Sequence, residues 1–380
     1  MSDSNSVLTR VPAEVWRRIL LEVMHVPYLL DTTCTGSLFE LWNAMDSPKA
    51  HWNRSEWQRK LLRRVCKSWK HFAETKAYRS IEFQDCVEEP HVLAHARRAQ
   101  LCQFLKHMFT EPTLWEVVEI YSDDLVDEFL VSIVQGYHPR LRRFSLRTNL
   151  SRVFAACESA AFHQLTFLHL QLFSEPPLTT TVIQTTMPQI EVLIWENAVG
   201  GPTPSDIFRL PTLHHFGWAD EHGRFPLSTL LSYASTLRSL SIRNEYWFRD
   251  TLVLPDLNEF PHLEELSTNV SFEIEGPKQV PPTYPLHTIY MNYLRSIAIQ
   301  GVMQILDCNP VKLRRIQSAE LEWGNGGEPE NLRYREDKDK IIQLADLCQE
   351  RGIRLEDYKG RVRSEMPPAV GLGDIAFLCV

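Results

Sequence analysis

Several signals of a secreted or membrane-bound protein are missing from this sequence. Its eight cysteines are scattered and never form a C-x-x-C pair, which argues against a disulfide framework or a zinc module. No apolar run approaches the roughly 20 residues that a membrane helix needs, and the first ten residues lack the apolar core of a signal peptide. We therefore expect a protein of the cytoplasm or the nucleus, with no membrane partner.

Positive charge is scarce over most of the chain. Residues 1–83 contain 13 Lys and Arg against 9 Asp and Glu, whereas the remaining residues contain 27 against 39. The net charge of -8 thus divides into about +4 at the start and about -12 afterwards. Because nucleic-acid binding depends on neutralising phosphates with Lys and Arg, we expect no nucleic-acid partner.

Catalytic and cofactor motifs are also absent. The sequence has neither a phosphate-binding loop nor a G-x-S-x-G nucleophile elbow. His91 and His95 have the spacing of a metal pair, and His214, His215 and His222 form a second group, but neither group has a convincing third ligand. We expect no enzyme activity, no cofactor and no metal; an unrecognised hydrolase is the minor alternative.

What the sequence does contain near its start is two amphipathic helices. Pro12 opens the first, and Ser55 with Gln58 forms a capping box at the start of the second. The apolar face of the first helix contains Val15, Trp16, Ile19, Leu20, Val23 and Met24. The apolar face of the second contains Trp57, Leu61, Leu62, Val65, Trp69 and Phe72. Lys and Arg on the other side of the second helix are typical of a solvated face.

Residues 11–20 and 65–70 resemble an F-box, whose pattern is Leu-Pro, an apolar helix, and later Val-Cys-x-x-Trp. In that family these apolar positions build a small helical core or contact the Skp-type adaptor of a cullin ubiquitin ligase. The resemblance implies an adaptor-binding set of Val11, Pro12, Val15, Ile19, Leu20, Val65, Cys66 and Trp69. From the residues alone, an ordinary helical hairpin of the core remains the alternative.

Two features depart from the family pattern. Val11 stands where the family usually has leucine, and it keeps the apolar contact. Residues 25–54 form a longer connection than is usual and are an insertion that could alter or crowd the adaptor surface. The apolar residues of this insertion that suggest an extra helical turn are Leu38, Phe39, Leu41 and Trp42.

The rest of the chain repeats a hexad of the form apolar-x-x-apolar-x-apolar. Clear hexads begin at Leu141, Leu165, Ile190, Leu213 and Leu237, so that successive starts are 24, 25, 23 and 24 residues apart. A looser series continues at Leu263 and then at Leu286 or Leu294, and residues 115–120 precede it. This period is typical of leucine-rich repeats, in which stacked units share one core.

Each unit is predicted as strand, turn and helix. The expected helices are residues 123–135, 227–235 and 302–306, and residues 337–350 and 353–355 are expected to form a capping helix and an edge strand. The predicted fold class is therefore α/β, with an F-box-like helical domain at 1–83, a leucine-rich-repeat-like solenoid at 84–360 with a curved parallel sheet and outer helices, and a loosely ordered tail at 361–380.

Strand alternation indicates which residues face the concave side. The fourth and sixth hexad residues point into the core, so the third, the fifth and the following residues face the other way. The set predicted to bind a target protein is Arg143, Arg147, Phe167, His169, Ile194, Glu196, His215, Arg243, Glu265, Asn269 and Tyr290. A solvated sheet with scattered apolar residues is the alternative for any one of them.

Together these patterns and the resemblance predict the substrate-recognition subunit of a cullin-type ubiquitin ligase. Its partners would be a Skp-type adaptor, through it the cullin ligase, and a target protein that the sequence does not identify. The alternative is a leucine-rich-repeat scaffold with no ligase role.

Overall fold

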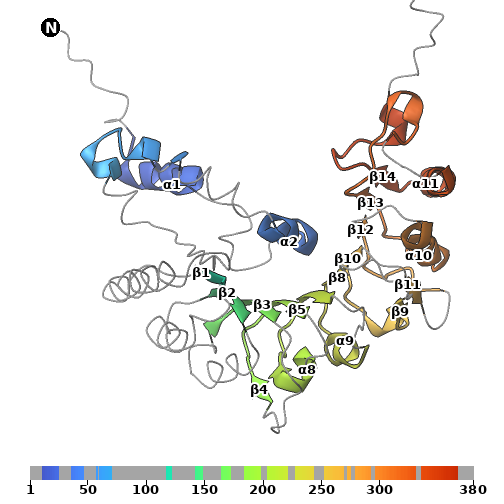
Figure 1. The fold of residues 1–380 in the computed structure, drawn as a ribbon, viewed down its shortest axis with the longest axis horizontal. Helices are drawn as coiled ribbons and strands as arrows, with labels where there is room; N and C mark the ends of the chain where they lie inside the picture. The colour runs from blue at the N-terminus through green and yellow to red at the C-terminus, as the bar shows by residue number, and fades with distance from the viewer. Residues whose placement is uncertain are drawn as a thin grey trace, which may run out of the picture.

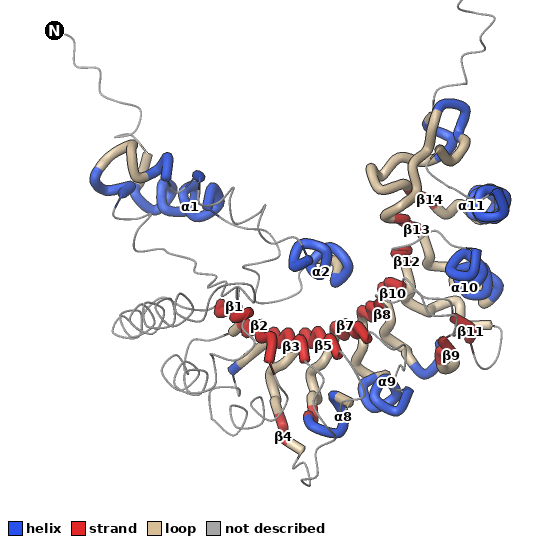
Figure 2. Tube along the Cα trace, in the orientation of Figure 1, coloured by secondary structure: helices blue, strands red, loops and turns tan. Residues whose placement is uncertain are grey.

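The computed structural model of this 380-residue chain describes residues 11–24, 36–46, 57–58, 60–70, 117–121, 142–148, 164–172, 184–197, 203–220, 227–243, 252–268, 272–274, 279–291, 296–330 and 335–366. The described chain is an α/β protein built around one ten-stranded sheet whose paired strands are all parallel. The sheet curves into an arc, with its strands along the inner side and α8, α9, α10 and α11 along the outer side (Figure 1 and Figure 2).

The sheet follows the order of the chain. Its strands are β1 (Val117–Tyr121), β2 (Arg143–Thr148), β3 (Phe167–Leu172), β5 (Val192–Asn197), β7 (His215–Asp220), β8 (Ser239–Arg243), β10 (Glu265–Thr268), β12 (Thr288–Met291), β13 (Arg315–Ser318) and β14 (Arg354–Glu356). The first residue of each strand pairs with the first residue of its neighbour, as in Arg143 with Phe167 and Phe167 with Val192. Equivalent residues therefore form rows that run across the arc.

The hexads predict these strands well. Each of the five clear hexads contains a strand of the sheet, as do the looser ones from Leu263 and Leu286 and the segment 115–120. The alternative hexad from Leu294 is wrong, because residues from Ser296 onward are helical in α10 (Ser296–Asp307). The sequence analysis missed β13, whose hexad starts at Leu313 and ends in a serine instead of an apolar residue.

The outer side is less regular than predicted. Helices α8 (Pro204–Ile207), α9 (Leu227–Tyr233) and α10 occupy it, together with the short strands β4 (Thr185–Thr186), β6 (Phe208–Arg209), β9 (Leu252–Leu254) and β11 (Phe272–Ile274). Strand, turn and helix is therefore wrong as a uniform description. The segments that form these outer strands have only two or three residues, which is too few for a stable helix. Some of them contain Thr or Val, which favour extended backbone. The predicted helix 123–135 lies outside the described residues.

The core lies between the sheet and these outer elements. The fourth and sixth hexad residues, such as Phe144, Leu193 and Trp195, are buried in one continuous apolar cluster that reaches Leu355 in the last strand. No unit could bury its own apolar face alone, because each strand supplies only two or three of these side chains.

The C-terminal cap forms as predicted. Helix α11 (Arg335–Glu350) is followed by Gly352 and then by β14. Gly352 has φ +68°, a left-handed conformation that glycine adopts easily and that commonly ends a helix. An antiparallel bridge joins Glu356 to Val362, beyond the predicted domain limit at 360. Arg363 donates to Asp346 over 2.8 Å, so residues 361–366 belong to the cap, and the tail from 367 lies outside the described residues.

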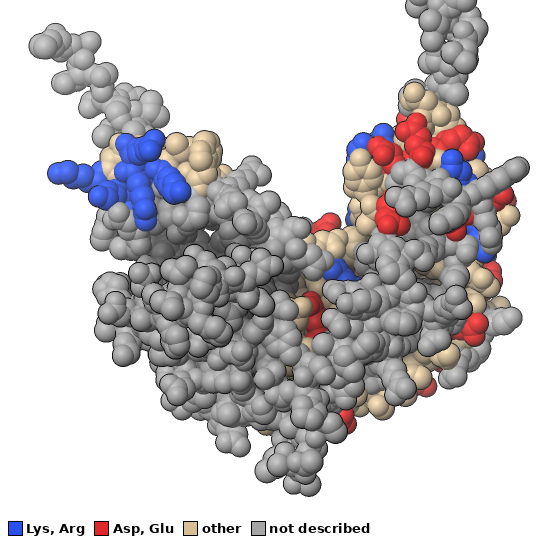
Figure 3. Space-filling view, viewed as in Figure 1, with Lys and Arg blue, Asp and Glu red and all other residues tan. Residues whose placement is uncertain are grey.

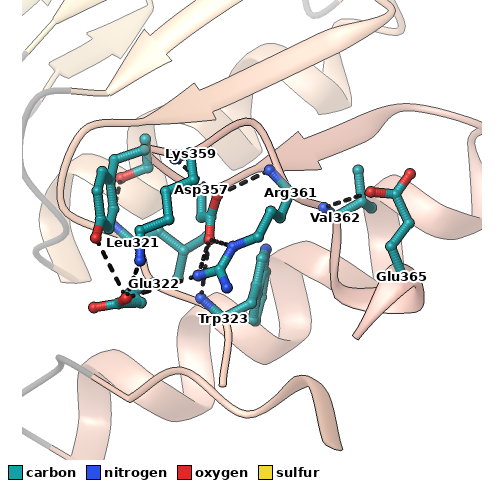
Figure 4. A network of polar contacts seen from close by, with 10 residues as sticks. Leu321, Glu322, Trp323, Asp357, Lys359, Arg361, Val362 and Glu365 are labelled. Carbon is teal, nitrogen blue, oxygen red and sulfur yellow. Dashed lines mark hydrogen bonds and ion pairs between the residues drawn. The ribbon is translucent and has the colours of Figure 1, made fainter. Parts of the chain in front are cut away.

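A buried carboxylate holds the cap together (Figure 4). Asp357 has no exposed side-chain surface and accepts hydrogen bonds from the backbone amides of Trp323, Lys359 and Arg361. The Arg361 guanidinium adds a hydrogen bond of 2.8 Å from Nε, and its Nη2 lies 2.7 Å from Oδ2 of Asp357 as an ion pair. Burial acts to raise the pKa of Asp357, but these donors, Arg361 foremost, hold the pKa below its ordinary value. The ionised carboxylate therefore ties the segment after β13 to the segment after β14.

The N-terminal helices divide between two places. Helix α1 (Ala13–Met24) begins after Pro12, as predicted, and packs with the helical residues 57–58, 60–62 and 67–70. Helix α2 (Leu38–Asp46), which forms in the predicted insertion, lies instead on the inner side of the arc and contacts β7 and β8 (Figure 2). The insertion thus contributes to the repeat arc and not only to the N-terminal unit.

Candidate functional site

Two apolar stripes remain uncovered on the N-terminal helices. Val15, Ile19 and Val23 recur every four residues on α1. Trp57 and Leu61 lie in the helical residues 57–58 and 60–62, whereas Val65 lies in a turn at 63–65, so the predicted second helix is wrong as one continuous helix. Their exposed fractions lie between 38% and 62%. The described residues contain only three other large apolar side chains this exposed: Leu231, Val311 and Tyr358. Such a concentration is typical of an interaction surface, and we call this candidate the N-terminal apolar surface.

The two segments are held together by a different set of side chains. The rings of Trp16 and Trp69 lie 5.3 Å apart, and Leu20 and Leu62 are buried beside Trp69. The single apolar face predicted for each helix therefore splits into a packed side and an open side. Leu62 and Trp69 fix the orientation in which the open side is presented.

The structure places the predicted adaptor-binding residues in three environments. Pro12, Val15, Ile19, Val65 and Cys66 are exposed, Val11 and Trp69 are half-buried, and Leu20 is buried. The sequence analysis did not assign Val23, Trp57 and Leu61 to this set. Their spacing of four residues from Ile19 and Val65 was the signal that could have found them.

Basic side chains gather on the same unit as the N-terminal apolar surface. Figure 3 shows Lys and Arg gathered over this unit, on one face of the molecule. The described residues of the unit include seven Lys and Arg, namely Arg17, Arg18, Lys60, Arg63, Arg64, Lys67 and Lys70, against only two acidic residues, Glu14 and Glu22. An apolar surface with a basic rim favours a partner whose matching surface is apolar with an acidic rim.

A second candidate site lies on the inner face of the arc, where α2 is seated. Trp42 is 1% exposed, and its indole N–H donates to Glu196 Oε1 over 3.2 Å. The Arg243 guanidinium lies 4.1 Å from the centre of the Trp42 ring and donates from Nη2 to Asn43 Oδ1 over 2.7 Å. We use the name tryptophan socket for Ile194, Glu196, Gly217 and Arg243 around this ring, together with His169, which contacts Glu196.

Gly217 makes room for the tryptophan. A Cβ atom at this position would lie 2.6 Å from the Trp42 ring and 3.2 Å from Ile194. Any other residue at position 217 would therefore push the indole ring away from the sheet. The missing side chain is a requirement of the socket and not of the strand, since this backbone is extended and other residues form strands there readily.

A chain of polar contacts supports the acceptor of the indole N–H. Ser145 Oγ lies 2.7 Å from His169 Nδ1, and His169 Nε2 lies 3.1 Å from Glu196 Oε1. Burial acts to raise the pKa of Glu196, but His169, Trp42 and Arg243 together hold it below its ordinary value. The carboxylate is therefore kept charged and fixed in position beneath α2.

A second aromatic anchor of α2 lies further along the arc. Phe39 stacks on Tyr290, with ring centres 4.4 Å apart and ring planes 16° apart. Glu265 accepts from the Leu38 amide and from Ser37; its pKa is raised by burial, which those bonds only partly oppose. The helix is thus anchored on β5, β7, β8, β10 and β12 by two aromatic rings and by hydrogen bonds at its N-terminal end.

Two serine hydroxyls of the inner face lack partners. Gly217, Ser241, Ser267 and Tyr290 follow one another in one row across β7, β8, β10 and β12. The hydroxyls of Ser241 and Ser267 are buried and have no hydrogen-bond partner among the described residues. A hydroxyl or amide group placed above these two serines would be able to hydrogen-bond to them.

The predicted target-binding residues lie on the inner face, but most of them are covered. Arg143, Phe167, His169, Ile194 and Tyr290 are buried, with the Arg143 guanidinium 4.1 Å from the centre of the Phe167 ring. Glu196, His215, Arg243 and Glu265 are half-buried. The Arg147 side chain and Asn269 lie outside the described residues. That α2 would sit on this face was not predicted, and a role of these residues in binding a target stays a prediction.

Burial of His215 predicts a pH dependence of stability. That burial, with the neighbouring His214 and Arg238 side chains, lowers the pKa of His215 to about 4. Below pH 6.5 the unfolded chain takes up a proton at this residue while the folded chain does not, so stability falls between pH 6.5 and 4. We expect His215→Gln to reduce this loss by about 2 kcal/mol, measured by urea unfolding at pH 7 and pH 4.5. The same slope in both proteins would contradict the assignment.

Neither the composition of the sites nor comparison with known proteins supplies an identity. The described residues contain no cluster of three or more His, Cys, Asp or Glu that could hold a metal ion. Among the same residues, no helix is both long and apolar enough to span a membrane. No protein-family model matches the chain, and no curated protein matches it. The two surfaces are therefore the features from which a function can be inferred.

Proposed function

We propose that this chain is the substrate-recognition subunit of a cullin-type ubiquitin ligase. Its F-box-like N-terminal helices would bind a Skp-type adaptor, and its leucine-rich-repeat-like arc would bind a target protein. The observation that carries the proposal is the N-terminal apolar surface, whose two stripes of three side chains are open to solvent while the packed sides of the same helices are closed. The F-box-like pattern at residues 11–20 and 65–70 identifies the chemistry of the partner.

Such a receptor acts by proximity and needs no catalytic group of its own. A target held on the arc and an enzyme carried by the adaptor's complex are brought to a high effective concentration of each other. The folded chain contributes the two binding surfaces. This role agrees with the absence of a catalytic motif in the sequence.

The test uses full-length protein with charges placed in the N-terminal apolar surface. We expect Ile19→Asp and Leu61→Asp each to weaken capture of a Skp-type adaptor at least tenfold. The reason is that loss of a central apolar side chain of an interface typically reduces the binding free energy by more than about 1.4 kcal/mol. Leu231→Asp, an equally exposed leucine on α9, is the matched control. Normal capture by the Ile19 and Leu61 variants, or no capture by the unchanged chain, would reject the proposal and favour a scaffold without a ligase role.

Point substitutions are preferable to truncation for this chain. Removing residues 1–83 would delete α2 as well as the N-terminal apolar surface, and would uncover Ile194, Tyr290 and their neighbours. Binding by such a fragment would then mix the loss of one surface with the opening of another. Ile19 and Leu61 are exposed, so their replacement leaves the packing of the fold unchanged.

A further inference from the structure

Helix α2 contacts the arc as a bound peptide contacts a receptor. Its partners Glu196 and Arg243 lie 154 and 200 residues further along the chain. The helix presents two aromatic side chains three positions apart, Phe39 and Trp42, which enter separate seats on the sheet. Recognition of a short helix by aromatic anchors at this spacing is a recurrent mode of protein–peptide binding.

The tryptophan socket is selective for its side chain. Gly217 provides the depth for a large flat ring, Glu196 accepts the indole N–H, and Arg243 covers the ring face. Ordinary core packing would require only an apolar surface of the right volume. A phenylalanine in the same seat would leave the charged oxygen of Glu196 without the indole donor, and an aliphatic residue would also lose the contact with Arg243.

The fit of α2 to the inner face is incomplete. Ser241 and Ser267 lie between the seats of Trp42 and Phe39, and their buried hydroxyls have no partner among the described residues. A helix with a hydroxyl or amide side chain above these serines would make hydrogen bonds that α2 does not make. Such a helix would gain contacts with this face that α2 lacks.

We propose that the inner face of the arc is a receptor for a short helix of another protein, one that carries a tryptophan with a second aromatic residue three positions before it, and that α2 is a resident competitor which this helix displaces. The partner helix would be uncharged or acidic, since α2 itself contains Glu40 and Asp46 and no Lys or Arg. If this partner is the target of a ubiquitin ligase, that identification rests on the proposed function. The proposal that the inner face binds such a helix does not depend on it.

The experiment adds the sequence of α2 as a separate peptide. A fluorescent peptide of residues 36–46 is titrated into the full-length variant Phe39→Ala with Trp42→Ala, in which the resident helix has lost both anchors. We expect saturable binding at least tenfold tighter than to the unchanged chain, where tethered α2 competes at an effective concentration on the order of millimolar. The same peptide with alanine at its tryptophan should not bind.

A further substitution tests the location of binding. Adding Gly217→Val to the double variant should abolish peptide binding, because the new side chain occupies the space of the indole ring. Lack of binding to a double variant that keeps its circular dichroism and cooperative unfolding would overturn the proposal. So would equal binding of the peptide without tryptophan, since α2 would then be ordinary packing.

The unchanged chain provides a second arm if the double variant does not fold. Excess peptide should displace α2 and speed proteolytic cleavage within residues 36–46 severalfold, with no change in cleavage of the arc; no change within 36–46 would also overturn the proposal. Capture of the Skp-type adaptor is measured in the same preparations. Retained capture without peptide binding rejects only the receptor, whereas peptide binding without capture rejects only the ligase role.

Discussion

Replacing Asp357 with alanine is expected to lower the free energy of unfolding by about 3 kcal/mol, among the largest single losses in the described chain. The substitution removes the acceptor of three backbone amides and of one guanidinium hydrogen bond, together with the ion pair to Arg361 (Figure 4). Breaking a buried charge pair costs about 3 to 5 kcal/mol, and the lower end applies here because Arg361 is 35% exposed and regains water.

Urea unfolding followed by circular dichroism measures this loss, with two control variants. Asp346→Ala removes a carboxylate that also bonds an arginine over 2.8 Å, but this one is 61% exposed, so we expect at most about 0.5 kcal/mol. Asp357→Asn keeps the shape and loses the charge, and should fall between the two. A loss at Asp357 no larger than at Asp346 would show that the buried network does not hold the cap.

Replacing Trp42 with alanine is expected to weaken the docking of α2 by about 3 kcal/mol and to leave the arc folded. The substitution removes a fully buried ring, the indole hydrogen bond and the contact with the Arg243 guanidinium. Because the core cluster of the arc does not include Trp42, the loss should be local to α2 and the socket. Hydrogen exchange of the α2 amides should accelerate about a hundredfold.

The matched control for this substitution is Trp57→Ala, which deletes the same side chain where it is 62% exposed. We expect no change in α2 exchange and less than about 0.5 kcal/mol in the unfolding of the whole chain. If Trp42→Ala instead unfolded the sheet cooperatively with α2, the helix would be part of the core, and the view of α2 as a separable occupant would be wrong.

The arc was predictable because its signal is local and repeated. A hexad such as that from Leu165 places two apolar residues on one side of a strand, and spacing of 23 to 25 residues stacks the strands in order. The signal failed where chemistry broke the pattern, as at β13, where Ser318 takes the sixth position. The uneven outer elements were not predictable from a pattern that describes only the strands.

The candidate sites divide in the same way. Val15, Ile19 and Val65 were found because helical spacing reveals an apolar face, but spacing alone does not separate the open stripe from the side that packs through Trp16 and Leu20. The contact of Trp42 with Glu196 spans 154 residues and depends on the curvature of the sheet, which no local pattern contains. The tryptophan socket therefore could not be predicted from the sequence.

The bridge between Glu356 and Val362 also bears on solubility. The last strand of the arc, β14, pairs with β13 on one side, and this bridge covers part of its other side. An open parallel edge presents unpaired amides and carbonyls that recruit strands from neighbouring molecules. Residues 357–362 fold back over part of that edge, and we expect a chain shortened before Val362 to aggregate more readily.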